Sequence, residues 1–460
     1  MRILHTADWH LGKKLVQFER TDEHLDFLNW LVNTLDQQSI DLLIIAGDIF
    51  DTGTPSNTAL ELYYRFLSRV KDTCCRDVIV IGGNHDSIST LNAPRELLHF
   101  FNVHVIGGVP ENFTDQIIKI YAGGHQKEEG QQSAEELQPA QGSQKTSGPD
   151  QGQGPENAAG LQLAKGPENT AGQLSGEDRQ PAIVVCAVPF LRDRDIRLSI
   201  AGETSDERES RIKQGITEHY HKFLPYIEVY KAAGIPVIAT GHLFAAGSST
   251  SESEKEIHVG NLGQVRADQF PVAFDYIALG HIHRPQLVNQ TKHIRYSGSP
   301  IPLSFSENED RKQVIIIEFN GSVMTDPIQL EVPCHRKLLR IKGSYEYIEE
   351  QILGLTDPEL KYPTWVELRI DTESLITDLE EKLAILKAGK PFIQEFFTRQ
   401  DKIKVAGTLD QLTGTLHDLA DLTPKEVFLK RCAAETGNED YTDLLILFDQ
   451  AVELMEQEKQ

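Results

Sequence analysis

Five short segments of the chain combine metal-binding side chains with an adjacent glycine or a preceding apolar run. They supply these candidate ligands: Asp8, His10, Asp48, Asn84, His242, His281 and His283. In four of the five segments a glycine stands directly before or within the ligand group, where it lets the backbone turn sharply and approach an ion. One such segment alone is a weak signal, but all five in this order predict one metal centre.

The mixture of carboxylate and imidazole ligands indicates divalent transition metals. Manganese, iron and zinc suit such a set, whereas calcium and magnesium call for mostly oxygen ligands. Asp48 is the natural candidate for a carboxylate that bridges two ions. Two ions roughly 3.5 to 4 Å apart lower the pKa of a bound water and neutralise phosphate oxygens during an in-line displacement. The pattern therefore predicts a two-metal phosphoesterase.

Two residues of the third segment are candidates for a direct part in catalysis. His85 follows the ligand Asn84, so it is expected beside the metal centre, where it would protonate the leaving oxygen or stabilise the transition state. Asp86 is predicted to orient His85 by accepting a hydrogen bond from its other ring nitrogen.

Other residues near the motifs are expected to pack in the core or to face solvent. His5 is expected in the core or behind the ligands, and Trp9 is expected to pack rather than to line a substrate groove. Four basic residues are candidate DNA contacts, for which a solvated surface is the better supported alternative: Lys13, Lys14, Arg192 and Arg194.

The ligand segments follow apolar runs that alternate with helical patterns, which predicts a layered α/β domain. The strand ends of such domains are the usual location of active sites. Strands are expected at residues 41–46, 77–81, 235–240, 276–279 and 314–319. Helices are expected at residues 23–36 and 58–70.

Composition marks an insertion and a domain boundary. Residues 124–180 are rich in Gln, Gly, Glu, Ala and Ser, so they are expected to be a disordered insertion at a turn between strands at 115–121 and 182–188. A boundary near residue 333 gives the first domain residues 1–333.

Two smaller parts are expected after this boundary. Residues 334–408 are predicted to form a compact α+β domain, and residues 409–460 a helical tail. The apolar face of the tail either docks a partner or packs on its own domain; both remain open. The elements expected in the smaller domain lie at residues 337–342, 345–355, 364–370, 374–386 and 402–405.

The net charge of −24 argues against a stand-alone protein that binds DNA through a broad basic face. The five cysteines include no C-x-x-C pair, which favours reduced thiols. Neither a signal peptide nor an apolar run of roughly 18 to 20 residues is recognised, so we expect a cytoplasmic protein without membrane contact.

The motifs resemble those of the calcineurin-like metallophosphoesterases, and within them the SbcD family of bacterial repair nuclease subunits. The likeness is close through the first domain, apart from the insertion, and weaker through residues 337–405. The segments that carry it are residues 5–12, 46–53, 83–87, 239–243, 276–284, 296–305 and 422–428.

The resemblance implies a layered β-sandwich nuclease domain flanked by helices, a DNA-capping domain and a tail that binds the coiled coil of an SbcC-type ATPase. It implies a manganese-dependent double-strand exonuclease and single-strand or hairpin endonuclease in DNA repair, replication and recombination, acting as a homodimer within the complex. His85 would be the catalytic histidine. The ligands of one ion would be Asp8, His10, Asp48 and His283, and those of the other Asp48, Asn84, His242 and His281.

Two alternatives use the same motifs. A small-substrate metallophosphatase or cyclic-nucleotide phosphodiesterase would share the chemistry but would not need the parts after residue 333. A non-enzymatic scaffold on the same fold is disfavoured because it would have lost ligands, and here every expected ligand type is present.

Overall fold

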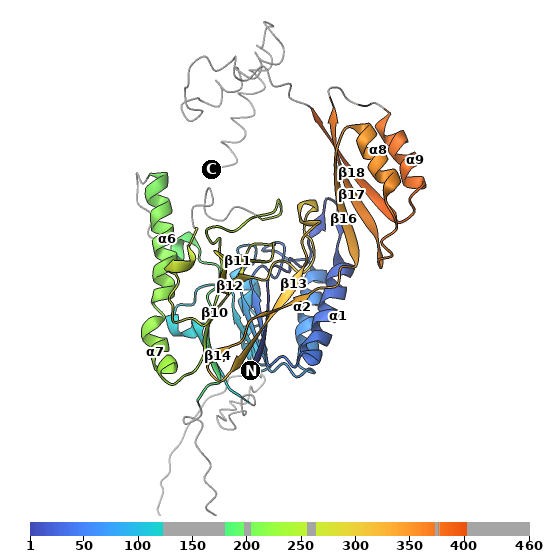
Figure 1. The fold of residues 1–460 in the computed structure, drawn as a ribbon. Coiled ribbons are helices and arrows are strands. Elements are labelled where there is room, and N and C mark those ends of the chain that lie inside the picture. Colours follow the sequence, from blue (N-terminus) through green and yellow to red (C-terminus); the bar gives the residue numbers. More distant parts are fainter. Residues whose placement is uncertain (123–179, 197–203, 255–263, 373–375, 377, 403–460) are drawn as a thin grey trace, which may run out of the picture. The chain divides into compact units, whose positions relative to one another are not determined.

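The computed structural model describes residues 1–122, 180–196, 204–254, 264–372, 376 and 378–402. Within them the chain forms two large β-sheets that pack face to face, with helices on both outer sides, and a smaller three-stranded sheet (Figure 1). The predicted tail at 409–460 and the predicted insertion, except for residue 180, lie outside the described residues.

The first sheet holds the N-terminal strands, and four of them run parallel. The strand Leu42–Ala46 consists of Leu, Ile and Ala and is buried along its whole length, as expected for a parallel strand covered on both faces. The strands of this sheet are β14 (Val323–Met324), β13 (Gln313–Asn320), β1 (Arg2–Thr6), β4 (Leu42–Ala46), β5 (Asp77–Ile81) and β6 (Val103–Ile106), with β15 (Ile328–Glu331) also paired to β13.

The second sheet holds the strands of the later ligand segments. Its strands are β11 (Gln286–Val288), β12 (Thr291–Tyr296), β10 (Tyr276–Gly280), β9 (Val237–His242), β8 (Ile183–Cys186) and β7 (Ile117–Ile120). The strands β7 and β8 pair in antiparallel fashion, so the segment between them joins two adjacent strands. This agrees with the predicted position of the insertion at a turn.

Helices cover the outer faces of the two sheets (Figure 1). Apolar residues of β1, β4 and β5 meet those of β8, β9 and β10 between the sheets. Each aliphatic side chain buried there contributes roughly 1.5 to 3 kcal/mol. The outer helices are α1 (Thr21–Gln37) and α2 (Asn57–Val70) on the first sheet, and α6 (Ser205–His221) and α7 (Leu224–Ala232) on the second. Shorter elements are α3 (Ile88–Asn92), α4 (Arg95–His99), α5 (Asp193–Ile196), β2 (Lys14–Leu15) and β3 (Phe18–Glu19).

The third sheet follows the predicted boundary near residue 333. It consists of β16 (Arg336–Gly343), β17 (Tyr362–Thr372) and β18 (Ile393–Lys402), and α8 (Tyr345–Gly354) and α9 (Leu379–Ala388) cover one face (Figure 1). The helix expected at 374–386 begins only at Leu379, which corrects that prediction. A strand lies at Ile393–Lys402, and residues 403–405 of the strand expected at 402–405 lie outside the described residues.

Residues Met1–Ile370 and Thr377–Arg399 form one compact unit, which includes the two larger sheets and most of the third. Most of the second unit, Asp371–Ile376 with Gln400–Gln460, lies outside the described residues. Within the described part, no helix combines the length and apolar character needed to cross a bilayer.

Candidate metal centre

The predicted ligands come from the carboxyl ends of strands in both large sheets. Asp8 follows β1 and Asp48 follows β4, whereas His242 ends β9 and His281 follows β10. The parallel strands of each sheet direct these ends to the same edge. All predicted ligands are buried, except that Asn84 is half-buried. Packing of the two sheets therefore brings together residues that are distant in the sequence.

The backbone at the site is held in unusual conformations. Four of the predicted ligands have positive φ angles: Asp8 at 54°, His10 at 46°, Asp48 at 49° and His281 at 99°. Such angles cost roughly 1 to 3 kcal/mol each for residues other than glycine, and they cluster at functional sites. They turn each side chain from its strand end into the shared space between the sheets.

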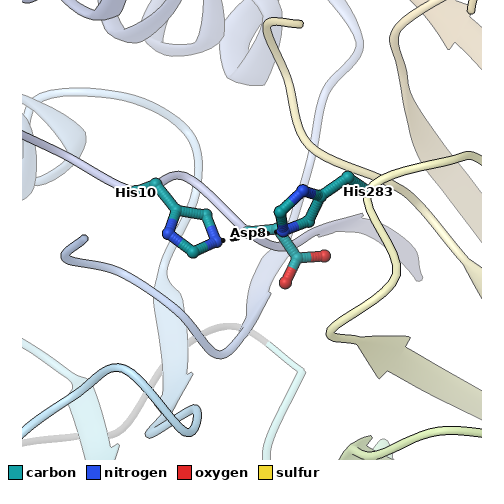
Figure 2. A group of neighbouring side chains, drawn as sticks. All are labelled: Asp8, His10 and His283. Carbon is teal, nitrogen blue, oxygen red and sulfur yellow. Dashed lines mark hydrogen bonds between the residues drawn. The ribbon is translucent and has the colours of Figure 1, made fainter. Parts of the chain in front are cut away.

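Asp8, His10 and His283 form the first candidate ligand group, with one possible ligand atom of each within 4.8 Å of the others. Figure 2 shows the nitrogen edges of the His10 and His283 rings pointing toward one another, and their Nε2 atoms are 3.1 Å apart. Asp8 accepts a hydrogen bond from the backbone N–H of His281 through Oδ1 (2.8 Å), whereas its buried Oδ2 has no hydrogen-bond partner among the described residues. A divalent cation fits here, because it would satisfy this oxygen and both imidazole nitrogens.

The second candidate group contains Asp48, His242 and His281. The amide oxygen of Asn84 completes it, at 3.0 Å from Nε2 of His242 and 3.3 Å from Nδ1 of His281. Oδ2 of Asp48 lies 3.3 Å from Nε2 of His242 and 3.4 Å from Nε2 of His10. One carboxylate oxygen thus faces both groups, as a bridging ligand would.

Two hydrogen bonds and one close carboxylate behind three histidines determine which ring nitrogen faces the centre. Nδ1 of His242 donates to the carbonyl oxygen of Ala46 (3.0 Å), and Nδ1 of His283 donates to the hydroxyl of Ser253 (2.6 Å). Nδ1 of His10 lies 3.3 Å from a carboxylate oxygen of Asp51. Each contact engages Nδ1 on the far side of the ring and directs Nε2 at the centre, which is the arrangement found in metal-binding histidines.

Burial and neighbouring charges shift the pKa values of the candidate ligands in both directions. Burial raises the pKa of Asp8 to about 7, although the charges of His242 and His283 act in the opposite direction. Burial lowers the pKa of His242, but the charge and hydrogen bond of Asp48 outweigh it and raise this pKa to about 9. Burial lowers the pKa of His10 to about 4. Protons and cations therefore compete for the same cluster near neutral pH.

His85 lies beside the first group, with its ring centroid 4.7 Å from that of His10. Its Nδ1 faces the backbone carbonyl oxygen of Asp51 at 2.6 Å, so this nitrogen is a donor. Its backbone N–H donates to Oδ1 of Asp48 at 2.9 Å, which turns Oδ2 of Asp48 toward the ligands. The arrangement suits proton transfer through Nε2 of His85.

The prediction that Asp86 accepts a hydrogen bond from His85 was wrong. Asp86 does not face Nδ1 of His85, because the Asp51 carbonyl takes that position. The buried carboxylate of Asp86 instead accepts hydrogen bonds from three backbone N–H groups, those of Ile49 (3.1 Å), Phe50 (3.0 Å) and Gly83 (2.9 Å). Asp86 therefore ties the segment after β4 to the segment after β5.

Other residues near the site lie as follows. His5 is buried and contacts the hydroxyl of Tyr276 (3.1 Å), and Trp9 is buried between aromatic rings of α1 and α2, as predicted for both.

Lys13 forms an ion pair with Asp51 (3.0 Å). A guanidinium nitrogen of Arg192 donates to the carbonyl oxygen of Asp86 (3.2 Å). The side chains of Lys14 and Arg194 are 56% and 73% exposed, which agrees with a solvated surface.

The sequence reasoning missed the residues that hold the ligands from behind. They are Asp51, Ser253, Glu254, Glu307 and Lys312. Only Asp51 carries a local signal, since it lies three positions after Asp48. The others belong to segments without a metal-binding motif and meet His283 only in the folded chain.

Comparison with known proteins assigns the chain to a family. Residues 1–138 match the model of the calcineurin-like phosphoesterases, and residues 334–436 match a model described as the type 5 capsule protein repressor C-terminal domain. The SbcD subunit of the nuclease SbcCD from Escherichia coli (strain K12) is 33% identical over 444 residues, which cover 95% of this chain and 94% of that protein. The chain belongs to the SbcD family.

Other members of the SbcD family match over shorter stretches. The SbcD protein of Bacillus subtilis (strain 168) is 29% identical and covers 87% of both chains, and that of Rhodobacter capsulatus is 30% identical and covers 75% of this chain and 73% of its own. The family expected from the motifs is thereby confirmed, and the nuclease interpretation is favoured over a small-substrate phosphoesterase.

Proposed function

We propose that this chain is the nuclease subunit of a complex with an SbcC-type ATPase and cleaves DNA phosphodiester bonds with two divalent cations, which we assign as Mn²⁺. The observation that carries the proposal is the position of Asp48, whose Oδ2 lies 3.4 Å from His10 and 3.3 Å from His242. Asp8, His10, Asp48 and His283 would hold one cation, and Asp48, Asn84, His242 and His281 the other. The carboxylate, imidazole and amide donors suit manganese.

The residues of the chain would divide the chemistry as follows. When bound, the cations would supply positive charge that activates the attacking water and offsets charge on the phosphate. His85 would give a proton to the leaving oxygen through Nε2, because its Nδ1 is occupied by the Asp51 carbonyl at 2.6 Å. Asp86 would keep the two ligand segments in register through its three backbone hydrogen bonds.

The proposal for the substrate and the partners is supported by membership of the SbcD family. We propose double-strand exonuclease and single-strand or hairpin endonuclease activity in the cytoplasm, in DNA repair, replication and recombination. The net charge of −24 supports a division in which the ATPase supplies much of the grip on DNA. Residues 334–408 would cap the DNA and residues 409–460 would bind the ATPase coiled coil. A homodimer within the complex stays a prediction, which the mass of the purified complex tests.

The test compares two substrates with Mn²⁺ present, a blunt linear duplex and bis(p-nitrophenyl) phosphate, for the chain alone and with its ATPase partner. We expect degradation of the duplex to depend on Mn²⁺ and to be stronger in the complex. Efficient hydrolysis of the small ester, without cleavage of DNA by either preparation, would overturn the proposal and favour a small-substrate phosphoesterase.

A further inference from the structure

A buried charged pair lies directly behind the predicted ligand His283. Glu307 is fully buried, and its Oε2 accepts from Nζ of Lys312 at 2.5 Å. Lys312 also donates to the backbone carbonyl oxygen of His283 and to the hydroxyl of Ser299, each at 3.0 Å. A buried ion pair of this kind is seldom a source of net stability, since desolvation offsets its attraction. Its contacts with His283 therefore suggest a role at the site.

The charge of Glu307 reaches the ring of His283 through one hydroxyl group. Nδ1 of His283 donates to Oγ of Ser253 at 2.6 Å, and this hydroxyl in turn donates to Oε1 of Glu307. Oε1 of Glu307 is itself 3.7 Å from Nδ1 of His283. The chain His283–Ser253–Glu307 fixes the proton on Nδ1, so that Nε2 faces His10 as Figure 2 shows.

The segment 251–254 holds His283 at a second point. Glu254 accepts from the backbone N–H of His283 at 2.9 Å. Ser251 binds both acidic residues of this cluster, at 2.7 Å from Oε2 of Glu254 and 3.0 Å from Oε1 of Glu307. The ring and the backbone of His283 are thus held by the same four-residue segment.

Two arginines of the third sheet contact the same segment. Glu252 accepts from Arg340 of β16 at 2.6 and 3.0 Å and from Arg369 of β17 at 3.2 Å. Its backbone N–H donates to the hydroxyl of Ser306, the residue before Glu307. The side chains of the two arginines are 19% and 23% exposed and that of Glu252 is 50% exposed, and both arginines also contact Glu367 of β17.

We propose that Glu307 is a positioning residue for His283, acting through Ser253, and that the Arg340–Glu252–Arg369 contact makes the hold on His283 depend on the third sheet. The inference rests on the proposed function, because it assigns His283 to a cation. Outer partners of metal-binding histidines orient the ring and raise its basicity, and their loss weakens metal affinity roughly 10- to 100-fold.

The first experiment measures Mn²⁺ binding by calorimetry and by the electron paramagnetic resonance signal of a coupled manganese pair. We expect Glu307→Gln and Ser253→Ala to keep one tight site, to weaken the other roughly 10- to 100-fold and to lose the coupled-pair signal. Ser253→Thr, which restores a hydroxyl, should recover binding. Asp275→Asn is the control, because it disrupts a partly buried pair, with Lys231 at 2.7 Å, at the opposite end of β10 from His281.

The outcomes separate this inference from the proposed function. If the unchanged protein binds fewer than two Mn²⁺, the proposed function fails. If it binds two and Ser253→Ala binds them equally well, the positioning role is overturned, even where Glu307→Gln fails to fold.

A second experiment tests the contribution of the third sheet. Glu252→Gln is expected to weaken the same Mn²⁺ site several-fold, whereas Asp268→Asn, which removes an exposed pair with Arg266, should leave it unchanged. Equal affinity in Glu252→Gln and the unchanged protein would remove the third sheet from the proposal.

Discussion

Asp48 contributes one carboxylate to both ligand groups. Its Oδ1 is held by the backbone N–H of His85 at 2.9 Å, which leaves Oδ2 between His10 and His242. The charge and hydrogen bond of His242 keep the pKa of Asp48 well below its usual value against the effect of burial. The carboxylate is therefore charged at neutral pH, as the proposed bridging role requires.

Asp48→Asn is accordingly expected to weaken Mn²⁺ binding at both positions, since one substitution removes a negative charge from each ligand group. Calorimetric titration with Mn²⁺ measures the loss, with Asp268→Asn as an exposed control. Retention of two sites at unchanged affinity would exclude a bridging role.

His85→Gln is expected to separate binding from cleavage, because the side chain belongs to none of the proposed ligand sets. Loss of a positioned general acid reduces the rate typically 10²- to 10⁴-fold. The variant should retain its Mn²⁺ content and its affinity for DNA, measured by metal analysis and by fluorescence anisotropy in the ATPase complex. Normal cleavage by the variant would remove His85 from the mechanism.

Among the elements, the turns after the strands set how closely the ligands approach. Gly83 follows β5 and packs against Asp48, where a Cβ atom would overlap both the carboxylate and the backbone nitrogen of Asp48. The carboxylate is held by a hydrogen bond from the backbone N–H of His85, and the second contact is with backbone. Neither the carboxylate nor the backbone nitrogen can therefore move without displacing the candidate ligands. Glycine is thus required at position 83, because the loop after β5 lies too close to Asp48 for any side chain.

Gly83→Ala should therefore reduce Mn²⁺ affinity and activity together, while the rest of the fold persists. Gly354→Ala is the control, because a Cβ there meets no atom within 4 Å. Circular dichroism and Mn²⁺ titration of both variants check the expectation, which an alanine variant with normal affinity would contradict.

The strand β1 carries a histidine that titrates differently in the folded and unfolded states. Burial lowers the pKa of His5 to about 3, although the carbonyl of Leu279 acts in the opposite direction. Because this pKa is below the unfolded value near 6.5, the unfolded state binds more protons between these values. The contribution of His5 to stability is complete above pH 6.5 and is lost as the pH falls toward 3.

His5→Phe should consequently reduce the drop in unfolding free energy between pH 7 and pH 5 by about 2 kcal/mol. The variant also loses its contacts with Tyr276 and Leu279, which lowers stability at both pH values. Urea unfolding at the two pH values isolates the difference, and the exposed His221 provides the control in His221→Phe. An unchanged pH difference in His5→Phe would refute this account.

For the whole molecule, the candidate metal centre lies where the two large sheets meet. Asp8 and Asp48 follow strands of the first sheet, and His242 and His281 belong to the second, so bound cations would connect them. A ligand that binds only the folded state stabilises it by about 2.7 kcal/mol at 100 times its dissociation constant. We expect Mn²⁺ to raise the melting temperature and a chelator to reverse the rise, both less in Asp48→Asn. A melting temperature independent of Mn²⁺ would contradict this.

Local sequence patterns were sufficient to place the candidate ligands after strands. Apolar runs such as Leu42–Ala46 specify strands, and the neighbouring glycines specify turns. The family, the insertion between two paired strands and the core position of His5 followed from the same local information. The start of the helix expected at 374–386 did not, because the helix begins later than the pattern indicated, and the strand Ile393–Lys402 was not recognised before residue 402.

The way in which each ligand is held became visible only in the folded chain. The Asp51 carbonyl faces His85 in place of Asp86, and Ser253 with Glu307 stands behind His283. These contacts depend on where two sheets place segments that are distant in sequence, and no spacing within a motif encodes that arrangement. The hydrogen-bond partner of each imidazole, and hence the nitrogen that it presents, is therefore a property of the packed fold.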